Sequence, residues 1–323
     1  MNGGKRMKKL MVLISILLVL TACDSDTEKL RQEVQPKENI ENVERTENKV
    51  KNDEEKKKQE EQAKGEKNDG EQAKDEKDEE IQVVEVSTAE LSNKTFAWGF
   101  RRMKNGIQPE FTASYAKPLD DYEGIYVGNK DKKVIYLTFD EGYENGYTAS
   151  ILDTLKDKEI EATFFVTKPY VKQNPDLIRR MIDEGHIVGN HTCKHKDMTK
   201  MKSIDDFAKE LYSLEELYEE NFGVKMQKYY RPPEGKFNEE NLKWATELGY
   251  KTVMWSFAYA DWDNGRQPSA ENAMRKILDN IHNGEVILLH PTSSTNAEIL
   301  KPLICELKSK GFRFGTLDEL CKR

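Results

Sequence analysis

The sequence predicts an α/β fold in which about seven parallel strands form a distorted (β/α) barrel. From residue 134 onward, short apolar runs of strand length alternate with longer runs of helix length. Strands that are regularly interrupted by helices pair in parallel through right-handed crossovers. This number of strands favours a closed or nearly closed barrel over an open sheet. No Gly-x-Gly-x-x-Gly or phosphate-binding loop indicates a nucleotide-binding fold.

The beginning of the chain has the charge order of a secretory signal. Basic residues at positions 5–9 precede an apolar stretch, Leu10 to Leu20, which is too short to span a bilayer comfortably. The segment Leu20 to Cys23, in which small residues precede the cysteine, resembles the lipobox of bacterial lipoproteins. We expect residues 1–22 to be a signal peptide and Cys23 to be lipidated, which anchors the protein to the outer face of the cytoplasmic membrane. A signal without lipidation and an uncleaved anchor are the alternatives, and both also export the domain.

Residues 23–95 are predicted to form a disordered, charged linker. The stretch 28–80 is mostly Lys, Glu, Asp, Gln and Asn, and no aromatic residue precedes Phe96. Such a composition cannot bury enough apolar surface to offset chain entropy. A coiled coil is the weaker alternative because apolar heptads are missing. The formal net charge of −8 gives no reason to expect binding to nucleic acid.

Residues 96–323 are expected to form the folded domain. We interpret its aromatic-rich start, 96–129, as a cap on the barrel, because a separate sugar-binding module of that length could not easily hold its own core. Each predicted strand is a short apolar run: 134–139, 162–166, 187–189, 229–230, 251–256, 286–289 and 312–314. The longer runs between them are predicted helices: 147–156, 175–184, 204–221, 238–248, 270–281 and 297–310.

The conspicuous polar residues of the domain follow predicted strands. In α/β barrels the carboxyl ends of the strands meet on one face, where catalytic groups are found. One such residue alone is more often structural, but several segments converge on this face. The candidates are Asp140, Glu141, His191, His195, Arg231, Asp261 and His290.

Glu141, His191 and His195 are predicted to bind a divalent metal ion. One carboxylate and two imidazoles leave a coordination position open for water. A bound ion lowers the pKa of that water and polarises a carbonyl oxygen. The same ligand types describe the facial triad of non-haem iron oxygenases, so the set alone does not settle the reaction. Asp140 favours hydrolysis, because a second carboxylate beside the metal can act as the general base.

Three further residues complete the predicted machinery. Arg231, in a loop stiffened by two prolines, is expected to pair with Asp140 and keep it ionised. His290 follows a very apolar strand and is a candidate general acid, with Asp261 holding its imidazole protonated.

The remaining histidines and cysteines are given structural roles. His186 and His282 lie at helix ends, and Cys193 is interpreted as a small packing residue between the two predicted histidine ligands. Whether Cys305 and Cys321 pair is left open, because the sequence does not fix their geometry.

At these residues the chain resembles the polysaccharide deacetylase family, also called the NodB-homology or carbohydrate esterase 4 domain. The resemblance covers residues 96–323. It implies that Asp140 is the base braced by Arg231, that the metal is zinc, and that His290 with Asp261 forms the acid side. It also implies an oxyanion hole that includes the main-chain N–H of Glu234. The motifs are Thr138 to Gly142, His191 to His195, Arg231 to Gly235, Asp261 with Trp262, and Leu288 to His290.

Within the family, the chain looks most like the N-acetylmuramic acid deacetylases that form muramic δ-lactam in spore cortex. The segments 138–148, 98–100 and 258–262 carry this likeness, and Glu141 stands where the family generally has Asp. The implied substrate is peptidoglycan glycan strands with peptide-free muramic residues. Deacetylation of peptidoglycan N-acetylglucosamine or of chitooligosaccharides is the nearest alternative. A non-catalytic, wall-binding lipoprotein is weaker, because the base, the histidines and the acid are all present.

Overall fold

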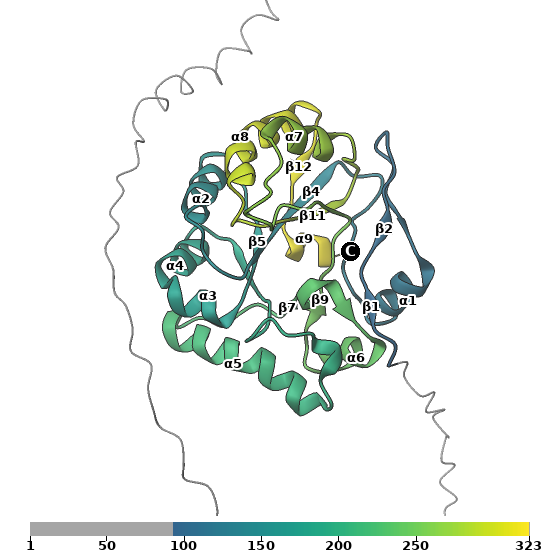
Figure 1. The fold of residues 1–323 in the computed structure, drawn as a ribbon, viewed down its shortest axis with the longest axis vertical. Helices are drawn as coiled ribbons and strands as arrows, with labels where there is room; N and C mark the ends of the chain where they lie inside the picture. The colour runs from purple at the N-terminus through teal and green to yellow at the C-terminus, as the bar shows by residue number, and fades with distance from the viewer. Residues whose placement is uncertain (1–92, 323) are drawn as a thin grey trace, which may run out of the picture. The chain divides into compact units, whose positions relative to one another are not determined.

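A computed structural model describes residues 93–322 of the chain. The predicted signal peptide, Cys23 and most of the predicted linker lie outside the described residues. The domain is built around a parallel sheet with the strand order β10-β11-β4-β5-β6-β7-β9, and β12 pairs with β4 in addition (Figure 1). Seven strands along this curled path confirm the predicted distorted barrel. The strands are β4 (Val134–Glu141), β5 (Thr163–Val166), β6 (Ile187–Asn190), β7 (Tyr229–Tyr230), β9 (Lys251–Thr252), β10 (Phe257–Ala258), β11 (Glu285–Leu289) and β12 (Arg313–Phe314).

Helices surround this sheet, and their ends follow the expected capping chemistry. The longest, α5, begins after Ser203, whose side chain accepts a hydrogen bond from the Asp206 N–H. It ends at Gly223, which takes the left-handed conformation that glycine tolerates. The helices are α1 (Ala113–Asp121), α2 (Thr148–Asp157), α3 (Lys168–Gln173), α4 (Pro175–Asp183), α5 (Ile204–Phe222), α6 (Glu239–Glu247), α7 (Ala270–Leu278), α8 (Ser294–Ser309) and α9 (Leu317–Cys321).

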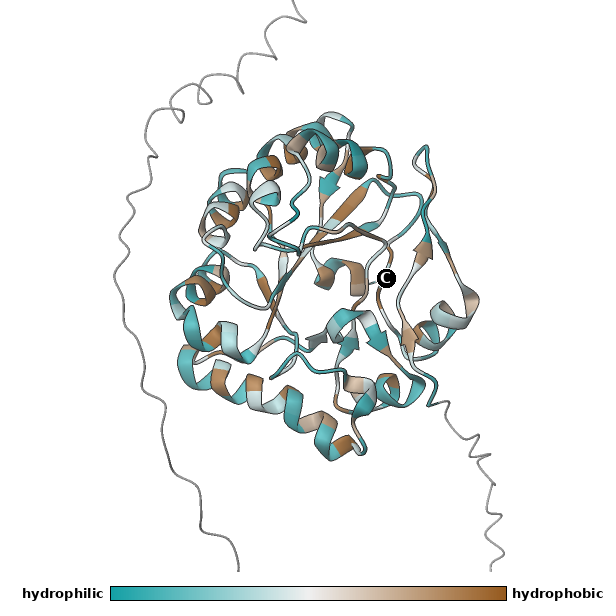
Figure 2. Cartoon of the chain, in the orientation of Figure 1, coloured by the Kyte–Doolittle hydropathy of each residue, from teal (hydrophilic) through white to brown (hydrophobic). Residues whose placement is uncertain are grey.

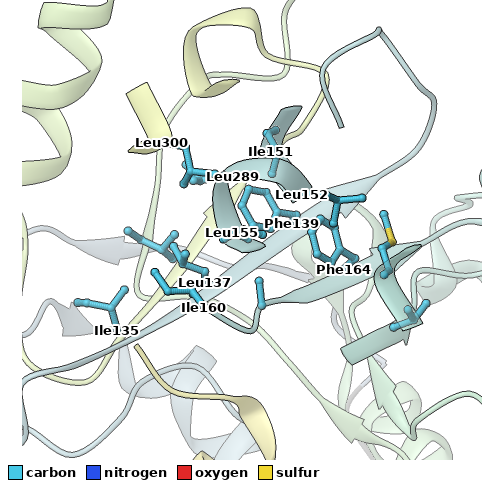
Figure 3. Packing of buried hydrophobic residues seen from close by; sticks show 14 of the residues in the cluster. Ile135, Leu137, Phe139, Ile151, Leu152, Leu155, Ile160, Phe164, Leu289 and Leu300 are labelled. Carbon is cyan, nitrogen blue, oxygen red and sulfur yellow. The ribbon is translucent and has the colours of Figure 1, made fainter. Parts of the chain in front are cut away.

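The two faces of β4 have different neighbours. Ile135, Leu137 and Phe139 belong to the largest apolar cluster, together with side chains of α2 and α8 (Figure 3). Val134 and Tyr136, which alternate with them, belong to a second cluster on the inner face of the curled sheet. Figure 2 shows the central strands in hydrophobic colour, whereas the surrounding helices carry hydrophilic colour on part of their surface. Residues at odd positions of β4 therefore face the helical layer, and those at even positions face the interior of the barrel.

The predicted strand 251–256 is wrong in its extent, because only its first two residues form a strand, β9, at one edge of the sheet. β9 ends at Thr252 and β10 begins at Phe257, so the connection 253–256 crosses the open side of the barrel. This connection is held by main-chain hydrogen bonds from Met254 N–H to the Ile125 carbonyl at 2.7 Å and from Ser256 N–H to Val286 at 2.9 Å. The sheet therefore curls into a half-barrel that is not hydrogen-bonded closed.

The aromatic-rich segment 96–129 packs beside this open side. Its first strand, β1 (Phe96–Ala97), pairs antiparallel with β8 (Lys236–Phe237), and β2 (Phe100–Arg101) pairs with β3 (Glu110–Phe111). The indole N–H of Trp98 donates to the Trp255 carbonyl at 2.8 Å, which ties the segment to the crossing connection. The sequence did not predict α1, which contains Pro118.

Two remaining expectations concern cysteines and membranes. No disulfide joins Cys305 in α8 to Cys321 in α9, and the Cys321 sulfur lies 3.5 Å from the Tyr229 hydroxyl oxygen. Between residues 93 and 322, none of the helices has the length and apolar character needed to cross a bilayer.

Candidate active site

A cavity of about 810 Å³ opens where the sheet strands end at their carboxyl side. Ligand-binding cavities of proteins commonly have such volumes. Arg231 and Asp261 are fully buried behind its lining, and each forms a hydrogen bond with a lining side chain. Five of the predicted site residues line the cavity directly: Asp140, His191, His195, Glu234 and His290.

Asp140 is held on one wall of the cavity by Arg231. One guanidinium N–H donates to Asp140 Oδ1 at 2.7 Å. Burial raises the pKa of Asp140, but the positive charge of Arg231, with contributions from His191 and His290, outweighs it and leaves the pKa below its usual value. Asp140 is therefore ionised at neutral pH and able to accept a proton.

Arg231 is itself fixed by groups around it. Its other N–H groups donate to the carbonyls of Val253 at 3.1 Å and Met254 at 3.3 Å, and its guanidinium lies 4.2 Å from the ring centre of Phe165. The connection that crosses the open side of the barrel thus supplies the acceptors that orient this arginine toward Asp140.

His290 is held on another wall by Asp261. Asp261 accepts from His290 Nδ1 and from the His290 main-chain N–H, each at 2.8 Å. Asn296 in α8 donates to the second oxygen of Asp261 at 2.6 Å, and its own carbonyl oxygen accepts from the Tyr259 hydroxyl. Burial lowers the pKa of His290, but the hydrogen bond and charge of Asp261 outweigh it, so the pKa lies above its usual value. His290 can therefore carry a proton to a leaving group.

The pH dependence of the predicted deacetylation tests whether Asp261 and His290 form the acid side of the site. An acid function of His290 is present at low pH and is lost as the pH rises through the pKa of the imidazole. In Asp261→Asn the carboxylate charge is missing, so we expect the alkaline limb of the kcat profile to move to lower pH. We also expect kcat at pH 8 to fall by about 10²-fold. Asp263→Asn is the matched control, because Asp263 pairs with Arg266 instead. An unchanged alkaline limb in Asp261→Asn would contradict the assignment.

His191 and His195 lie together at the cavity, with ring centres 4.8 Å apart. Nδ1 of His191 lies 2.8 Å from the Arg231 carbonyl and must carry the proton, because a carbonyl oxygen only accepts. Burial is the main cause that lowers the pKa of His191 to about 4, so its imidazole is neutral at pH 7. Its unprotonated Nε2 then faces Asp140 Oδ2 at 3.6 Å. Because Nε2 of His191 and Oδ2 of Asp140 are both hydrogen-bond acceptors, their proximity favours a cation or a proton between them.

Glu141 does not join these histidines, contrary to the predicted ligand set. β4 continues through Glu141, so its side chain points to the helical layer, opposite to Asp140. It is fully buried there and accepts a hydrogen bond from the Thr148 hydroxyl at 3.2 Å. Burial raises the pKa of Glu141 well above its usual value, and the nearby Glu144 raises it further. The carboxyl group therefore belongs to a buried network with α2 and not to the cavity.

The three-ligand zinc site predicted from the sequence accordingly does not fit this geometry. Within residues 93–322, no three His, Cys, Asp or Glu side chains are arranged to hold a metal ion. His191 and His195 are the predicted ligands that remain at the cavity. Zinc therefore stays a prediction from the resemblance.

Two loops at the cavity contain strained backbone. Thr192, His195 and Glu234 have φ values of 73°, 51° and 57°, in the left-handed region that non-glycine residues rarely adopt. Such conformations persist only where the surroundings impose them, and they are frequent at functional sites. Glu234 follows the two prolines after Arg231, so this backbone places the N–H predicted for the oxyanion hole in a loop that borders the cavity.

Comparison with known proteins places the chain in a family. The model of the family described as polysaccharide deacetylase matches residues 127–253. The chain is also 42% identical over 228 residues to the peptidoglycan-N-acetylmuramic acid deacetylase PdaA of Bacillus subtilis. The alignment covers 71% of this chain and 86% of PdaA. The chain belongs to the polysaccharide deacetylase family.

Solved structures of family members agree with this assignment. The Bacillus subtilis PdaA structure, described as a family 4 carbohydrate esterase, superposes with a TM-score of 0.69 at 42% identity. The match covers 72% of this chain and 98% of the chain in that structure. A family 4 carbohydrate esterase from Bacillus anthracis gives a TM-score of 0.60 at 41% identity, with the same coverage. A Bacillus cereus peptidoglycan-N-acetylglucosamine deacetylase is 34% identical over 206 residues, 62% of this chain and 73% of its own length.

The sequence did not predict several residues of this polysaccharide deacetylase site. Asn296, which supports Asp261, lies six positions after His290, in a helix that begins earlier than predicted. Tyr143 is a large exposed aromatic side chain at the cavity, and Trp255 lines the cavity from the crossing connection. Trp262, which belongs to one of the predicted motifs, is a second exposed aromatic side chain there. The motif Thr138 to Gly142 could have indicated Tyr143, which directly follows it, whereas Trp255 depends on where the barrel opens.

Proposed function

We propose that this chain is a peptidoglycan N-deacetylase that hydrolyses the acetamide of N-acetylmuramic acid. The observation that carries the proposal is the pair of opposed titratable groups at one cavity. Arg231 holds the pKa of Asp140 below its usual value, and Asp261 holds the pKa of His290 above its usual value. Environments that push two pKa values apart in this way assign the base and the acid of a reaction. The similarity to PdaA, at 42% identity, supports the muramic sugar over the glucosamine alternative, at 34%.

The proposed reaction uses groups of this chain. Asp140 takes a proton from a water molecule while the water oxygen bonds to the acetyl carbonyl carbon. The main-chain N–H of Glu234 donates to the oxyanion that forms. The carbon–nitrogen bond then breaks, and His290 gives its proton to the departing amine. The products are acetate and the free amino sugar.

A lipid anchor, and a role in the spore cortex, belong to the same proposal. The sequence of the N-terminal segment, with Cys23 after small residues, supports export and lipidation. Metabolic labelling with a palmitate analogue tests the anchor, and an unlabelled wild-type protein would remove it from the proposal.

Acetate release combined with mass spectrometry tests the enzymatic function. The purified protein is incubated with cortex-like peptidoglycan that carries peptide-free muramic residues, and separately with N-acetylglucosamine oligomers. We expect acetate from the first substrate and loss of the acetyl group from muramic residues. Loss from glucosamine would favour the alternative substrate. No release from either substrate, with or without added divalent ions, would favour a non-catalytic wall-binding protein.

A further inference from the structure

A second hollow adjoins the active-site cavity. It has a volume of about 430 Å³ and shares Trp255, Ala258, Tyr259 and Trp262 with the lining of the cavity. The two spaces therefore adjoin at these residues, and we call them together the groove. Aromatic side chains along such a groove provide apolar faces against which sugar rings can pack.

Arg102 is the only charged residue among the described residues that line this hollow. It is exposed, but its guanidinium is positioned by two contacts. One N–H donates to the Ala258 carbonyl, and the group lies 5.4 Å from the ring centre of Phe257. A guanidinium has five N–H donors, so most remain available to a ligand in the groove.

The position of Arg102 relates it to the reacting groups. Ala258 of β10 pairs with Leu288 of β11, two residues before His290. Arg102 therefore lies beside the strands that place the general acid. No Lys or Arg is among the described residues that line the main cavity, and Arg231 behind it is occupied by Asp140. An anion in the groove would accordingly meet Arg102.

We propose that Arg102 binds the lactyl carboxylate of the muramic residue whose acetamide is hydrolysed. This inference rests on the proposed function and names the residue that selects the sugar. In N-acetylmuramic acid the lactyl group sits on the carbon next to the one that bears the acetamide, whereas N-acetylglucosamine has a hydroxyl there. The lactyl carboxylate is charged only when no stem peptide is attached, because the peptide converts it to a neutral amide. A guanidinium at this position thus favours peptide-free muramic residues over both other forms.

Steady-state kinetics of Arg102→Gln test the inference. With a peptide-free muramic oligosaccharide we expect KM to rise by about five- to tenfold while kcat stays unchanged. This rise corresponds to the loss of one solvent-accessible, charged hydrogen bond. For an N-acetylglucosamine oligomer added as a competitive inhibitor we expect an unchanged inhibition constant, and Arg102→Lys should restore part of the lost affinity for the muramic substrate. Arg101→Gln is the matched control, because Arg101 is the adjacent arginine and pairs with Glu110.

The outcomes separate this inference from the proposed function. An equal effect of Arg102→Gln on the KM of the muramic substrate and on the inhibition constant of the glucosamine oligomer, or no effect on that KM, overturns the role of Arg102 while muramic deacetylation by the wild type stands. A wild-type protein that releases no acetate from the muramic substrate overturns both.

Discussion

Asp140→Asn is expected to lower kcat for acetate release by about 10³-fold, because an amide cannot accept the proton of the attacking water. The substitution keeps the size of the side chain and an oxygen that can still accept from Arg231. We therefore expect the variant to fold, with the circular dichroism spectrum of the wild type. The measurement is single-turnover acetate release at pH 7 with the muramic substrate.

Glu141→Gln is the matched control for this variant, since it makes the same chemical change at the next residue. Its carboxyl group lies in the buried network with Thr148, and its raised pKa favours the neutral form, which an amide imitates closely. We expect acetate release close to that of the wild type. Loss of activity in both variants would contradict the assignment of Glu141 to the helical layer and would restore it as a candidate ligand.

The adjacent carboxylates show what the sequence could and could not predict. The apolar run that ends just before Asp140 was correctly predicted as a strand, and the position of the site at strand ends followed from it. The alternation of side chains along that strand already separates Asp140 from Glu141, provided that the strand continues through both. The sequence does not reveal where a strand ends to within one residue, and that single residue decides whether both carboxylates can reach the cavity.

The fold was predicted best where apolar runs are long and worst where tertiary contacts override local pattern. β4 and β11 agree with the prediction to within two residues at each end. In the predicted strand 251–256 only Lys251 and Thr252 form a strand, because main-chain hydrogen bonds to Ile125 and Val286 draw residues 253–256 across the open side of the barrel. No local pattern encodes such partners, and the same contacts position Arg231 and Trp255 at the site.

Arg231→Met is expected to lower the free energy of unfolding by about 3–5 kcal/mol, because it leaves the buried carboxylate of Asp140 without its partner. The substitution also removes the charge that holds the pKa of Asp140 below its usual value, so that burial then raises it. A base must be ionised to act, and the acidic limb of the kcat profile should therefore move to higher pH. Chemical denaturation and pH-dependent acetate release measure the two effects.

The double variant distinguishes loss of the ion pair from loss of packing. Asp140→Asn removes the charge that Arg231→Met leaves unpaired, so the two substitutions together should destabilise the protein by less than the sum of the single effects. If the losses in the free energy of unfolding simply add, the guanidinium acts mainly through its contacts with Phe165 and the carbonyls of Val253 and Met254. In that case the acidic limb should stay in place in Arg231→Met. If Arg231 is the group that keeps Asp140 ionised, two results must therefore occur together. The double variant must show a coupling energy between the two residues, and the acidic limb of the kcat profile must shift in Arg231→Met.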